Sequence, residues 1–265
     1  MRRVLFKHKR NLGQHFIVSD EVIKKMIIIS GTLEHFNIIE IGPGYGALTR
    51  EILKHNPKSL LAVEKDSSFI KFHSHLLNTY KSKYRIIEAD ALYLAEETLI
   101  SPPIKLIANL PYNISVMLCI KWLHKIKYFT SLILILQQEV VERLVAQPNS
   151  RYYGFLSIIS QLLCNIKKEF DILPTDFYPI PKVHSAAITL NVLPIQRYEV
   201  NLDSLIKITN IIFTQRRKMI RKILQGITNH VNVVLDNTQL SGLERPASLT
   251  IEQLCILTNN LSSMI

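Results

Sequence analysis

The chain has 265 residues, of which 48% are hydrophobic and 20% are charged. This composition argues against wholesale disorder and supplies enough apolar side chains for a full core, in one large domain or one domain with a small appendage. The formal net charge of +11 favours a polyanionic partner, either a nucleic acid or an anionic membrane surface, although a basic enzyme without such a partner has the same balance.

The sequence gives no sign of a membrane span, an export signal or a cysteine-based site. No apolar run approaches the ~18 residues that a span needs, and the longest clean run is Leu132–Leu136. The three cysteines form no CxxC pair, so neither a disulfide framework nor a cysteine-rich zinc site is indicated. We expect a cytoplasmic protein, because polar residues rather than an apolar signal core follow the first basic residues, which are Arg2, Arg3, Lys7, Lys9 and Arg10.

Strand-like and helical runs alternate through the first half of the chain, after an expected helix at Asp20–Ile29. Alternation of this kind predicts an α/β fold with a parallel sheet covered on both faces. The expected strands are Asn37–Ile41, Ser59–Glu64, Tyr84–Glu88, Ile104–Ala108 and Ser131–Leu136. The helices expected between and after them are Ala47–Lys54, Ser67–Asn78, Ser115–His124 and Gln138–Ala146.

The pattern changes in the second half. Two late strands, Asn165–Ile172 and Ala186–Val192, are expected on either side of the proline-rich stretch Pro174–Pro181, and they bring the sheet to seven strands. Beyond Pro194 only helices are expected, at Leu202–Leu224 and Thr250–Leu261. We therefore expect one domain over residues 1–195 and a small all-helical domain over residues 196–265.

A glycine-rich turn follows the first strand of the sheet. Gly42 and Gly44 permit a tight strand-to-helix turn and a close approach of a ligand to the backbone. Glu64 ends the next strand, where a carboxylate can accept hydrogen bonds from both ribose hydroxyls of a nucleoside, and Asp90 follows the third. The same pattern fits a dinucleotide fingerprint or a ligand-free turn, and a lone Asp in a turn is often a helix cap.

The fourth strand runs into Asn109-Leu110-Pro111-Tyr112, which resembles the active-site segment of amino-methyltransferases that use S-adenosylmethionine. The NLPY form is similar to that of the ribosomal-RNA adenine dimethyltransferases. Other segments resemble that family in the same order along nearly the whole chain: Asn11–Phe16, Glu40–Gly44, Phe177–Ser185 and the helix with Arg216–Lys218.

This resemblance implies a Rossmann-like class I methyltransferase with a mostly parallel sheet and a helical C-terminal domain. It implies S-adenosyl-L-methionine as cofactor and dimethylation of the N6 amine of two adjacent adenosines near the 3′ end of 16S rRNA, within an immature small ribosomal subunit. We expect a monomer. The implied cofactor-binding residues are His15, Ile17, Gly42, Gly44, Glu64, Asp90 and Asn109; His15 stands where the family usually has Asn, and Ile17 where it has Leu.

The chemistry of the fourth-strand segment can be argued from the residues. The amine of adenine is a poor nucleophile because its lone pair is delocalised into the ring. Two acceptors aimed at its N–H bonds, the Asn109 side-chain carbonyl and the Leu110 backbone carbonyl, favour a tetrahedral nitrogen and offset its developing positive charge. Pro111 restricts the backbone around both acceptors. We expect Asp to replace Asn109 in part, and Ala not to.

An adenine in folded RNA must leave its stack to reach such a site, and aromatic faces are needed to receive it. Tyr112 and Phe177 are the candidate platforms, with ordinary core packing as the alternative. Direct displacement from sulfur needs no metal, and the scattered histidines show no HExxH spacing, so we expect no metal site.

A basic run occupies five of the seven positions from Arg216 to Lys222. We expect it to bind RNA phosphates, with the basic start of the chain as a second patch. A solvated helix face helped by the helix dipole explains one or two such charges, not five. The residues concerned are Arg216, Arg217, Lys218, Arg221 and Lys222.

Other functions remain open on the sequence. A large-subunit rRNA adenine methyltransferase of the macrolide-resistance type has the same fold. A non-catalytic RNA-binding assembly factor is possible on the same scaffold, although intact Glu64, Asp90 and Asn109 argue against it. A nicotinamide oxidoreductase fits the glycine loop but gives the NLPY segment no role.

Overall fold

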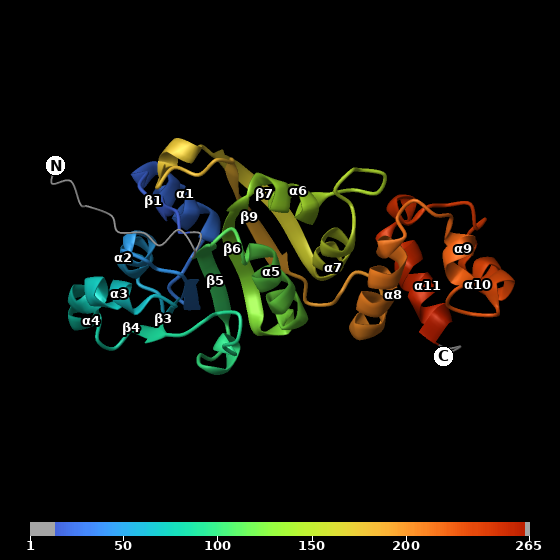
Figure 1. Cartoon of the computed structure of the whole chain (residues 1–265). Helices are drawn as coiled ribbons and strands as arrows, with labels where there is room; N and C mark the ends of the chain where they lie inside the picture. Colours follow the sequence, from blue (N-terminus) through green and yellow to red (C-terminus); the bar gives the residue numbers. More distant parts are fainter. Residues whose placement is uncertain (1–13, 263–265) are drawn as a thin grey trace. The chain divides into compact units, whose positions relative to one another are not determined.

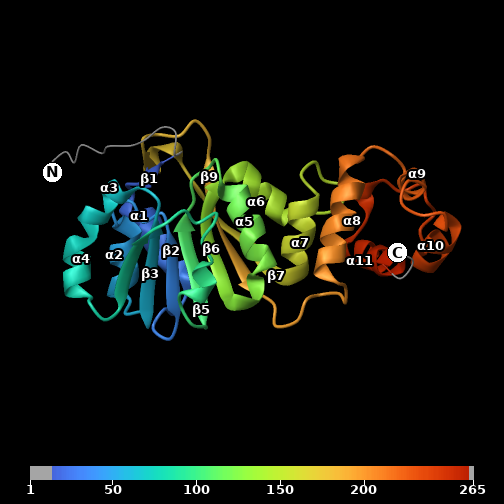
Figure 2. The same cartoon turned by 60° about the horizontal axis from the view of Figure 1, so that its bottom comes forward.

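A computed structural model describes residues 14–262 (Figures 1 and 2). The described residues fall into two compact units, one formed by residues 14–141 and 165–192 and the other by residues 142–164 and 193–262. The expected domain boundary near residue 195 stays a prediction, and residues 142–164 group with the C-terminal helices. The basic residues near the start of the chain and Asn11–Gly13 lie outside the described residues.

A seven-stranded sheet organises the first unit, in the order β4-β3-β2-β5-β6-β9-β7. The strands from β4 to β6 in this order pair in parallel, whereas β9 pairs antiparallel with β6. The expected α/β fold with a mostly parallel seven-stranded sheet is therefore confirmed. The strands are β2 (Asn37–Ile41), β3 (Ser59–Glu64), β4 (Tyr84–Glu88), β5 (Ile104–Asn109), β6 (Phe129–Gln137), β7 (Cys164–Ile172) and β9 (Ser185–Val192).

Helices cover both faces of this sheet. All five residues of β2 are buried, as in a strand that is covered on both sides. Ile38 belongs to a core cluster with residues of α1 and α2, and α5 lies on the opposite face in Figures 1 and 2. The helices of this unit are α1 (Asp20–Ser30), α2 (Ala47–Lys54), α3 (Ser67–Ile70), α4 (Ser74–Thr79) and α5 (Ser115–His124), and α6 (Gln138–Val145) runs into the second unit.

Local sequence explains where α1 begins and which face it buries. Ser19 has an extended backbone, and its side chain accepts a hydrogen bond from the Val22 amide, which satisfies a free N–H of the first turn. Apolar residues at helical spacing then face the core: Val22, Ile23, Met26 and Ile27.

Two features of the first unit differ from the sequence-based expectations. The single helix expected at Ser67–Asn78 is three short pieces, with a 3₁₀ turn at Lys71–His73 between α3 and α4. Two-residue strands also appear outside the main sheet: β1 (Phe16–Ile17) pairs antiparallel with β8 (Phe177–Tyr178). This pairing attaches the segment before α1 to the proline-rich stretch before β9.

The second unit is mainly helical. The helix expected at Leu202–Leu224 is wrong in its length, because the chain leaves the helix at Gln215 and Met219 is extended, with φ −66° and ψ 144°. The basic run therefore starts in a turn between two helices. The helices of this unit are α7 (Phe155–Leu163), α8 (Leu202–Thr214), α9 (Ile220–Leu224), α10 (Val231–Thr238) and α11 (Ile251–Ser262).

Candidate active site

A cavity opens at the carboxyl ends of β2, β3 and β5, where ligands bind in doubly wound sheets. Its empty volume is about 770 Å³, which includes space at its mouth that is open to solvent. Five of the residues predicted to bind the cofactor line it: His15, Gly42, Glu64, Asp90 and Asn109. Ile17 lines a neighbouring cavity on the side of α1 and α2 instead. The cofactor-binding roles of all these residues stay predictions.

The glycine turn is connected to Glu64 at the end of β3. The Gly44 amide donates a hydrogen bond of 3.1 Å to Glu64 Oε2, and the Asp66 amide donates one of 2.8 Å to Oε1. Burial raises the pKa of Glu64 in spite of these bonds. Gly44 has φ +53°, and a Cβ there would lie 2.7 Å from the Phe16 ring, so glycine is needed on both grounds.

His73 contacts the carbonyl group of the same glycine, a contact that the sequence did not reveal. Its Nε2 lies 2.9 Å from the Gly44 carbonyl oxygen, and its Nδ1 lies 2.5 Å from the hydroxyl of Tyr84. The imidazole is fully buried, and burial lowers its pKa. A neutral ring that donates to Gly44 and accepts from Tyr84 satisfies every polar atom of this chain of contacts.

Asp90 begins the loop after β4. Lys65 Nζ lies 2.7 Å from its Oδ2, and the Leu92 amide donates 3.0 Å to its Oδ1. Burial alone would raise the pKa of Asp90, but these two bonds outweigh burial and lower the pKa below its usual value. The carboxylate therefore stays charged at the cavity wall. The bond to Leu92 stabilises a turn at residues 91–93 and not the start of a helix, so the helix cap offered by the sequence as the alternative to ligand binding is not formed.

Asn109 is the last residue of β5, half-buried at the cavity. Its Nδ2 donates a hydrogen bond of 2.7 Å to the backbone carbonyl of His15. This bond uses the donor end of the amide and leaves Oδ1 as its acceptor. The next residue, Leu110, has a buried side chain and donates its amide to the Ile135 carbonyl of β6, so the strand end is fixed from two sides.

Tyr112 follows in the same segment and is covered by His15. Its hydroxyl lies 2.6 Å from Ser185 Oγ, and its ring stacks on the His15 imidazole with centroids 5.0 Å apart at 26°. His15 Nδ1 in turn lies 2.7 Å from the Pro179 carbonyl. One face of the Tyr112 ring is thus already in contact with an aromatic side chain.

Phe177, the second predicted stacking platform, is a core residue in this structure. Its side chain is 1% exposed and packs with Ile17 and Ile172, because the pairing of β8 with β1 turns it inward. Stacking on a base would need the ring to leave this packing, so its stacking role stays a prediction. The neighbouring Tyr178 is 42% exposed.

Glu40 lies beneath the glycine turn, on the α1 and α2 side of β2. Desolvation raises the pKa of its carboxyl to about 8. Among the residues that the structure describes, its Oε2 has no hydrogen-bond partner, although the atom is buried.

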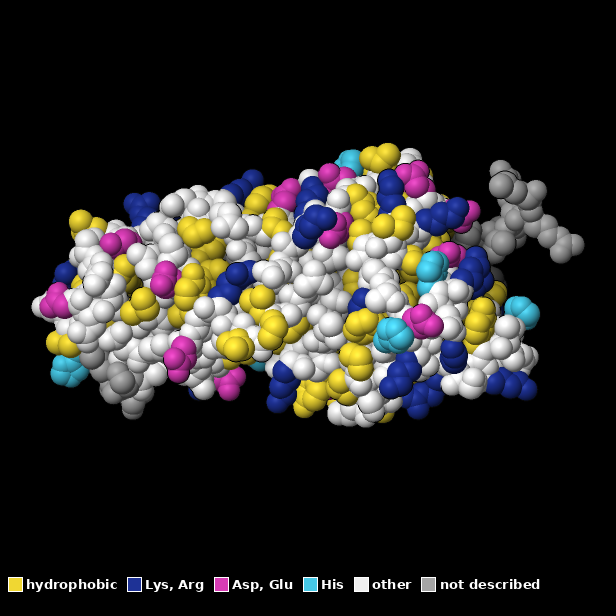
Figure 3. Space-filling model, turned by 180° about the vertical axis from the view of Figure 1, so that it is seen from behind, with side chains coloured by type: hydrophobic (Ala, Val, Ile, Leu, Met, Phe, Trp, Pro, Cys, Tyr) yellow, Lys and Arg dark blue, Asp and Glu magenta, His cyan; other side chains and the backbone are white. Residues whose placement is uncertain are grey.

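The predicted phosphate-binding residues have two kinds of environment. Arg217, Lys218 and Lys222 are exposed. Arg216 donates to the Ser150 carbonyl, and Arg221 Nη1 donates to Asn232 Oδ1, so these two side chains also stabilise the second unit. On the face shown in Figure 3, Lys and Arg are interspersed with acidic and apolar side chains and form no continuous stripe.

Residues 14–262 contain neither a metal-binding cluster nor a membrane-spanning helix. No group of three His, Cys, Asp or Glu side chains there is placed to hold a metal ion. No helix in the same range has the length and apolarity to cross a membrane.

Comparison with known proteins decides the family. The chain matches the profile of ribosomal RNA adenine dimethylases over residues 5–262. The chain belongs to this family. Proteins named ribosomal RNA small subunit methyltransferase A from Wolbachia sp. subsp. Drosophila simulans (strain wRi) and Ehrlichia ruminantium (strain Gardel) are 60% and 44% identical to it. The alignments cover 100% and 95% of this chain and 97% and 96% of those proteins.

Solved structures show that the adenine dimethylase fold extends beyond these relatives. A dimethyladenosine transferase from Plasmodium falciparum has a TM-score of 0.80 at 22% identity, covering 94% of this chain and 98% of that one. The 23S rRNA methyltransferase ErmE has a TM-score of 0.71 at 21% identity, covering 93% and 99%. The family membership confirms the resemblance drawn from the sequence motifs. It also rules out the nicotinamide oxidoreductase that the glycine loop alone left open.

Proposed function

We propose that this adenine dimethylase transfers methyl groups from S-adenosyl-L-methionine to the N6 amine of two adjacent adenosines near the 3′ end of 16S rRNA. Its substrate is the immature small ribosomal subunit, and it acts as a cytoplasmic monomer. The observation that carries the proposal is the position of Asn109, whose amide is held at the cavity by the His15 carbonyl with its oxygen as the acceptor.

The cavity has the polar groups that a sulfonium nucleoside needs. Glu64 accepts one backbone N–H on each oxygen and keeps lone pairs for the ribose hydroxyls. Asp90 is a charged acceptor for the adenine amine, and apolar residues such as Val63 and Ala91 line the walls between them. When bound, the cofactor supplies an electrophilic methyl group on a positively charged sulfur, which the nearby carboxylates favour.

The protein's own groups then prepare the target amine. Asn109 Oδ1 and the Leu110 carbonyl accept its two N–H bonds, which directs the nitrogen lone pair at the methyl carbon and offsets positive charge on nitrogen. Tyr112 supplies a face for the base. No side chain needs to act as a nucleophile, because positioning and electrostatics supply the catalysis, and the proton of the product leaves to water.

The small-subunit assignment is supported by the relatives. Eight relatives at 40–60% identity carry the name ribosomal RNA small subunit methyltransferase A. Similarity to ErmE is similarity of fold and does not separate the two substrates. The intact Glu64, Asp90 and Asn109 constellation likewise supports an enzyme rather than an assembly factor without activity.

The test is a transfer assay with labelled S-adenosylmethionine and unmodified small and large ribosomal subunits, followed by nucleoside analysis. We expect dimethyladenosine in the small-subunit RNA. Label only in the large-subunit RNA would move the assignment to the macrolide-resistance type, and no label in either would leave a binding function.

A further inference from the structure

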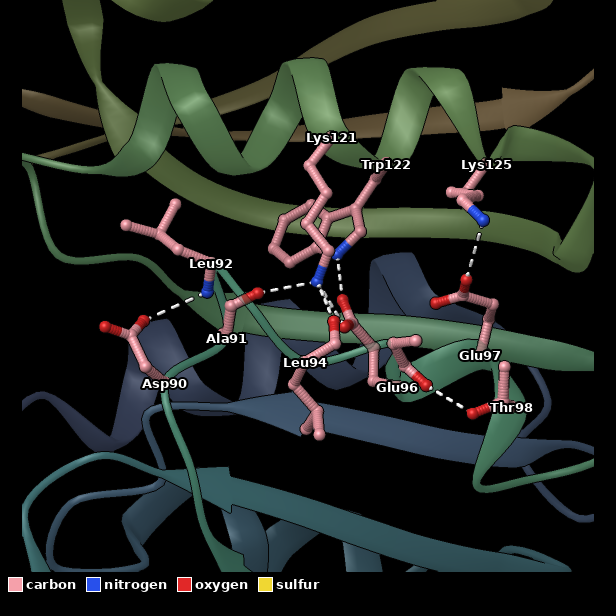
Figure 4. A network of polar contacts seen from close by, with 11 residues as sticks. Asp90, Ala91, Leu92, Leu94, Glu96, Glu97, Thr98, Lys121, Trp122 and Lys125 are labelled. Carbon is pink, nitrogen blue, oxygen red and sulfur yellow. Dashed lines mark hydrogen bonds and ion pairs between the residues drawn. The ribbon is translucent and has the colours of Figure 1, made fainter.

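A buried cluster of polar contacts joins α5 to the loop after β4 (Figure 4). Lys121 Nζ donates to three oxygens: the Ala91 carbonyl at 2.6 Å, the Leu94 carbonyl, and Glu96 Oε2. The indole N–H of Trp122 donates to the other oxygen of Glu96. Trp122 and Glu96 are 0% exposed and the Lys121 side chain is 20% exposed, so the cluster is largely shielded from solvent.

Every strong donor and acceptor in this cluster is used. An ammonium has three N–H donors, and Lys121 directs each at a different oxygen, while both Glu96 oxygens are occupied. Buried ionic networks are costly unless they are fully satisfied, and removal of one partner leaves a charge unpaired. Lys121 therefore holds the loop firmly at two backbone carbonyls, in a stretch where regular secondary structure does not satisfy them.

The held loop forms part of the cofactor cavity. Asp90 and Ala91 line the cavity directly, and Lys121 donates a hydrogen bond to the Ala91 carbonyl. Helix α5 begins at Ser115, just after a segment of which Asn109–Pro111, Asn113 and Ile114 line the same cavity. The cluster thus connects the loop with Asp90 to the helix that follows the catalytic segment.

We propose that Lys121, together with Glu96, is a positioning residue that sets the nucleoside side of the cofactor cavity. This inference rests on the proposed function, because the ligand of that cavity is taken to be S-adenosylmethionine. Lys121 does not touch the ligand; it fixes the backbone at Ala91 and, one residue before it, the carboxylate of Asp90.

The test compares Lys121→Met with Lys125→Met, a matched control four residues further on, at the C-cap of α5. Lys125 also pairs with a carboxylate of the same loop, at 3.3 Å from Glu97, whose side chain is 2% exposed. The Lys125 side chain itself is 50% exposed, and the bonds to the Ala91 and Leu94 carbonyls come from Lys121, so the control removes an ion pair and leaves those two bonds in place. The dissociation constant of S-adenosylhomocysteine is measured by calorimetry well below each Tm, together with that of adenosine. For Lys121→Met we expect roughly tenfold weaker binding of both ligands, the effect of losing one charge-assisted hydrogen bond. For Lys125→Met we expect a change of less than about twofold.

Folding is followed separately by Tm and by the emission of Trp122, the only tryptophan of the chain. Lys121→Arg is the second variant: it keeps the charge, but a planar guanidinium does not match three converging oxygens, so we expect an intermediate loss of affinity. Lowered Tm with unchanged ligand affinity in both folded Lys121 variants would make the cluster purely structural and overturn the inference. Failure of the wild-type protein to bind S-adenosylhomocysteine would instead overturn the proposed function, and this inference with it.

Discussion

The backbone carbonyl of His15 accepts a hydrogen bond of 2.7 Å from Nδ2 of Asn109. The two residues are 94 positions apart in sequence, and the contact joins the segment before α1 to the tip of β5. Because the carbonyl can only accept, it orients the amide with its nitrogen toward His15 and its oxygen elsewhere. This contact makes Asp a poorer substitute at position 109 than the sequence argument expects, because that argument considers only the side-chain oxygen of Asn109 and not its N–H donor.

Asn109→Asp should therefore be a poor substitute near neutral pH. A carboxylate oxygen would face the His15 carbonyl without a proton between them, and we expect turnover to fall roughly 100-fold, as for a lost hydrogen bond replaced by repulsion. A protonated Asp can donate to the carbonyl, so the activity of the variant relative to wild type should rise as pH falls. Turnover and S-adenosylhomocysteine affinity are measured from pH 6 to pH 8. A flat ratio at wild-type level would contradict the orientation argument.

His15→Ala separates the backbone of His15 from its side chain. The contact to Asn109 uses the carbonyl and survives the substitution, so we expect turnover at saturating substrate to stay within about threefold of wild type. Asn109→Ala, in contrast, should lower turnover by roughly 100-fold and leave cofactor affinity within about twofold. Steady-state kinetics with both variants provides the comparison. Equal losses in the two variants would show that the imidazole, not the carbonyl, matters.

His73→Ala should weaken cofactor binding through the glycine turn. Loss of the contact to the Gly44 carbonyl leaves a buried acceptor unpaired, which costs roughly 1–3 kcal/mol. We expect about tenfold weaker S-adenosylhomocysteine binding and a lower Tm. His75→Ala is the matched control, because His75 is exposed two residues away. Unchanged affinity in His73→Ala would mean that Glu64 alone fixes the turn.

Glu40 predicts a pH dependence of stability. Its pKa is raised from 4.5 to about 8 by burial, so between these values the folded protein keeps a proton that the unfolded chain releases. Stability attributable to this group is therefore fully present below pH 4.5 and is lost as pH rises towards 8, by at most about 1.4 kcal/mol per pH unit. Glu40→Gln should flatten this part of the curve. Denaturant unfolding at several pH values measures it, and parallel curves for both proteins would refute the assignment.

The basic run predicts a salt-dependent contribution to RNA binding. Charge reversal at the three exposed positions, Arg217, Lys218 and Lys222, should weaken binding and reduce the slope of log K against log salt concentration by roughly 2 to 3. Arg216 is a poor choice for this test, because its contact with the Ser150 carbonyl stabilises the second unit. Reversal of Lys167 and Lys168, in the first unit, is the control. The same slope in both variants would favour a solvated surface over a phosphate site.

Much of the sheet could be predicted from the sequence because its strands are continuous apolar runs between clear breaks. The expected bounds of β2, β3, β4, α2 and α5 agree with the structure. The strands β1 and β8 are too short to leave a pattern, since each exists only through pairing with the other. The end of α8 at Thr214 was missed for a similar reason: apolar spacing continues through Ile220 and Ile223, although the backbone turns between Thr214 and Ile220.

The candidate site was predictable where the ends of parallel strands bring residues together, and not where it depends on side-chain contacts between other segments. The residues Glu64, Asp90 and Asn109 line one cavity, as expected from strands that end at one edge of the sheet. His73 and Lys121 gave no signal, because a lone His or Lys in a helical segment looks like a solvated side chain. The inward orientation of Phe177 also follows from strand pairing that the sequence does not show.

The most direct test of the central claim is a structure of the protein with S-adenosylhomocysteine and an RNA fragment that carries the target adenosines. The account predicts an unstacked adenine whose N6 lies about 3 Å from both Asn109 Oδ1 and the Leu110 carbonyl, with the sulfur beyond it on the side of the nitrogen lone pair. An adenine bound with N6 turned away from these two oxygens, or a sulfur on the far side of β5, would contradict it.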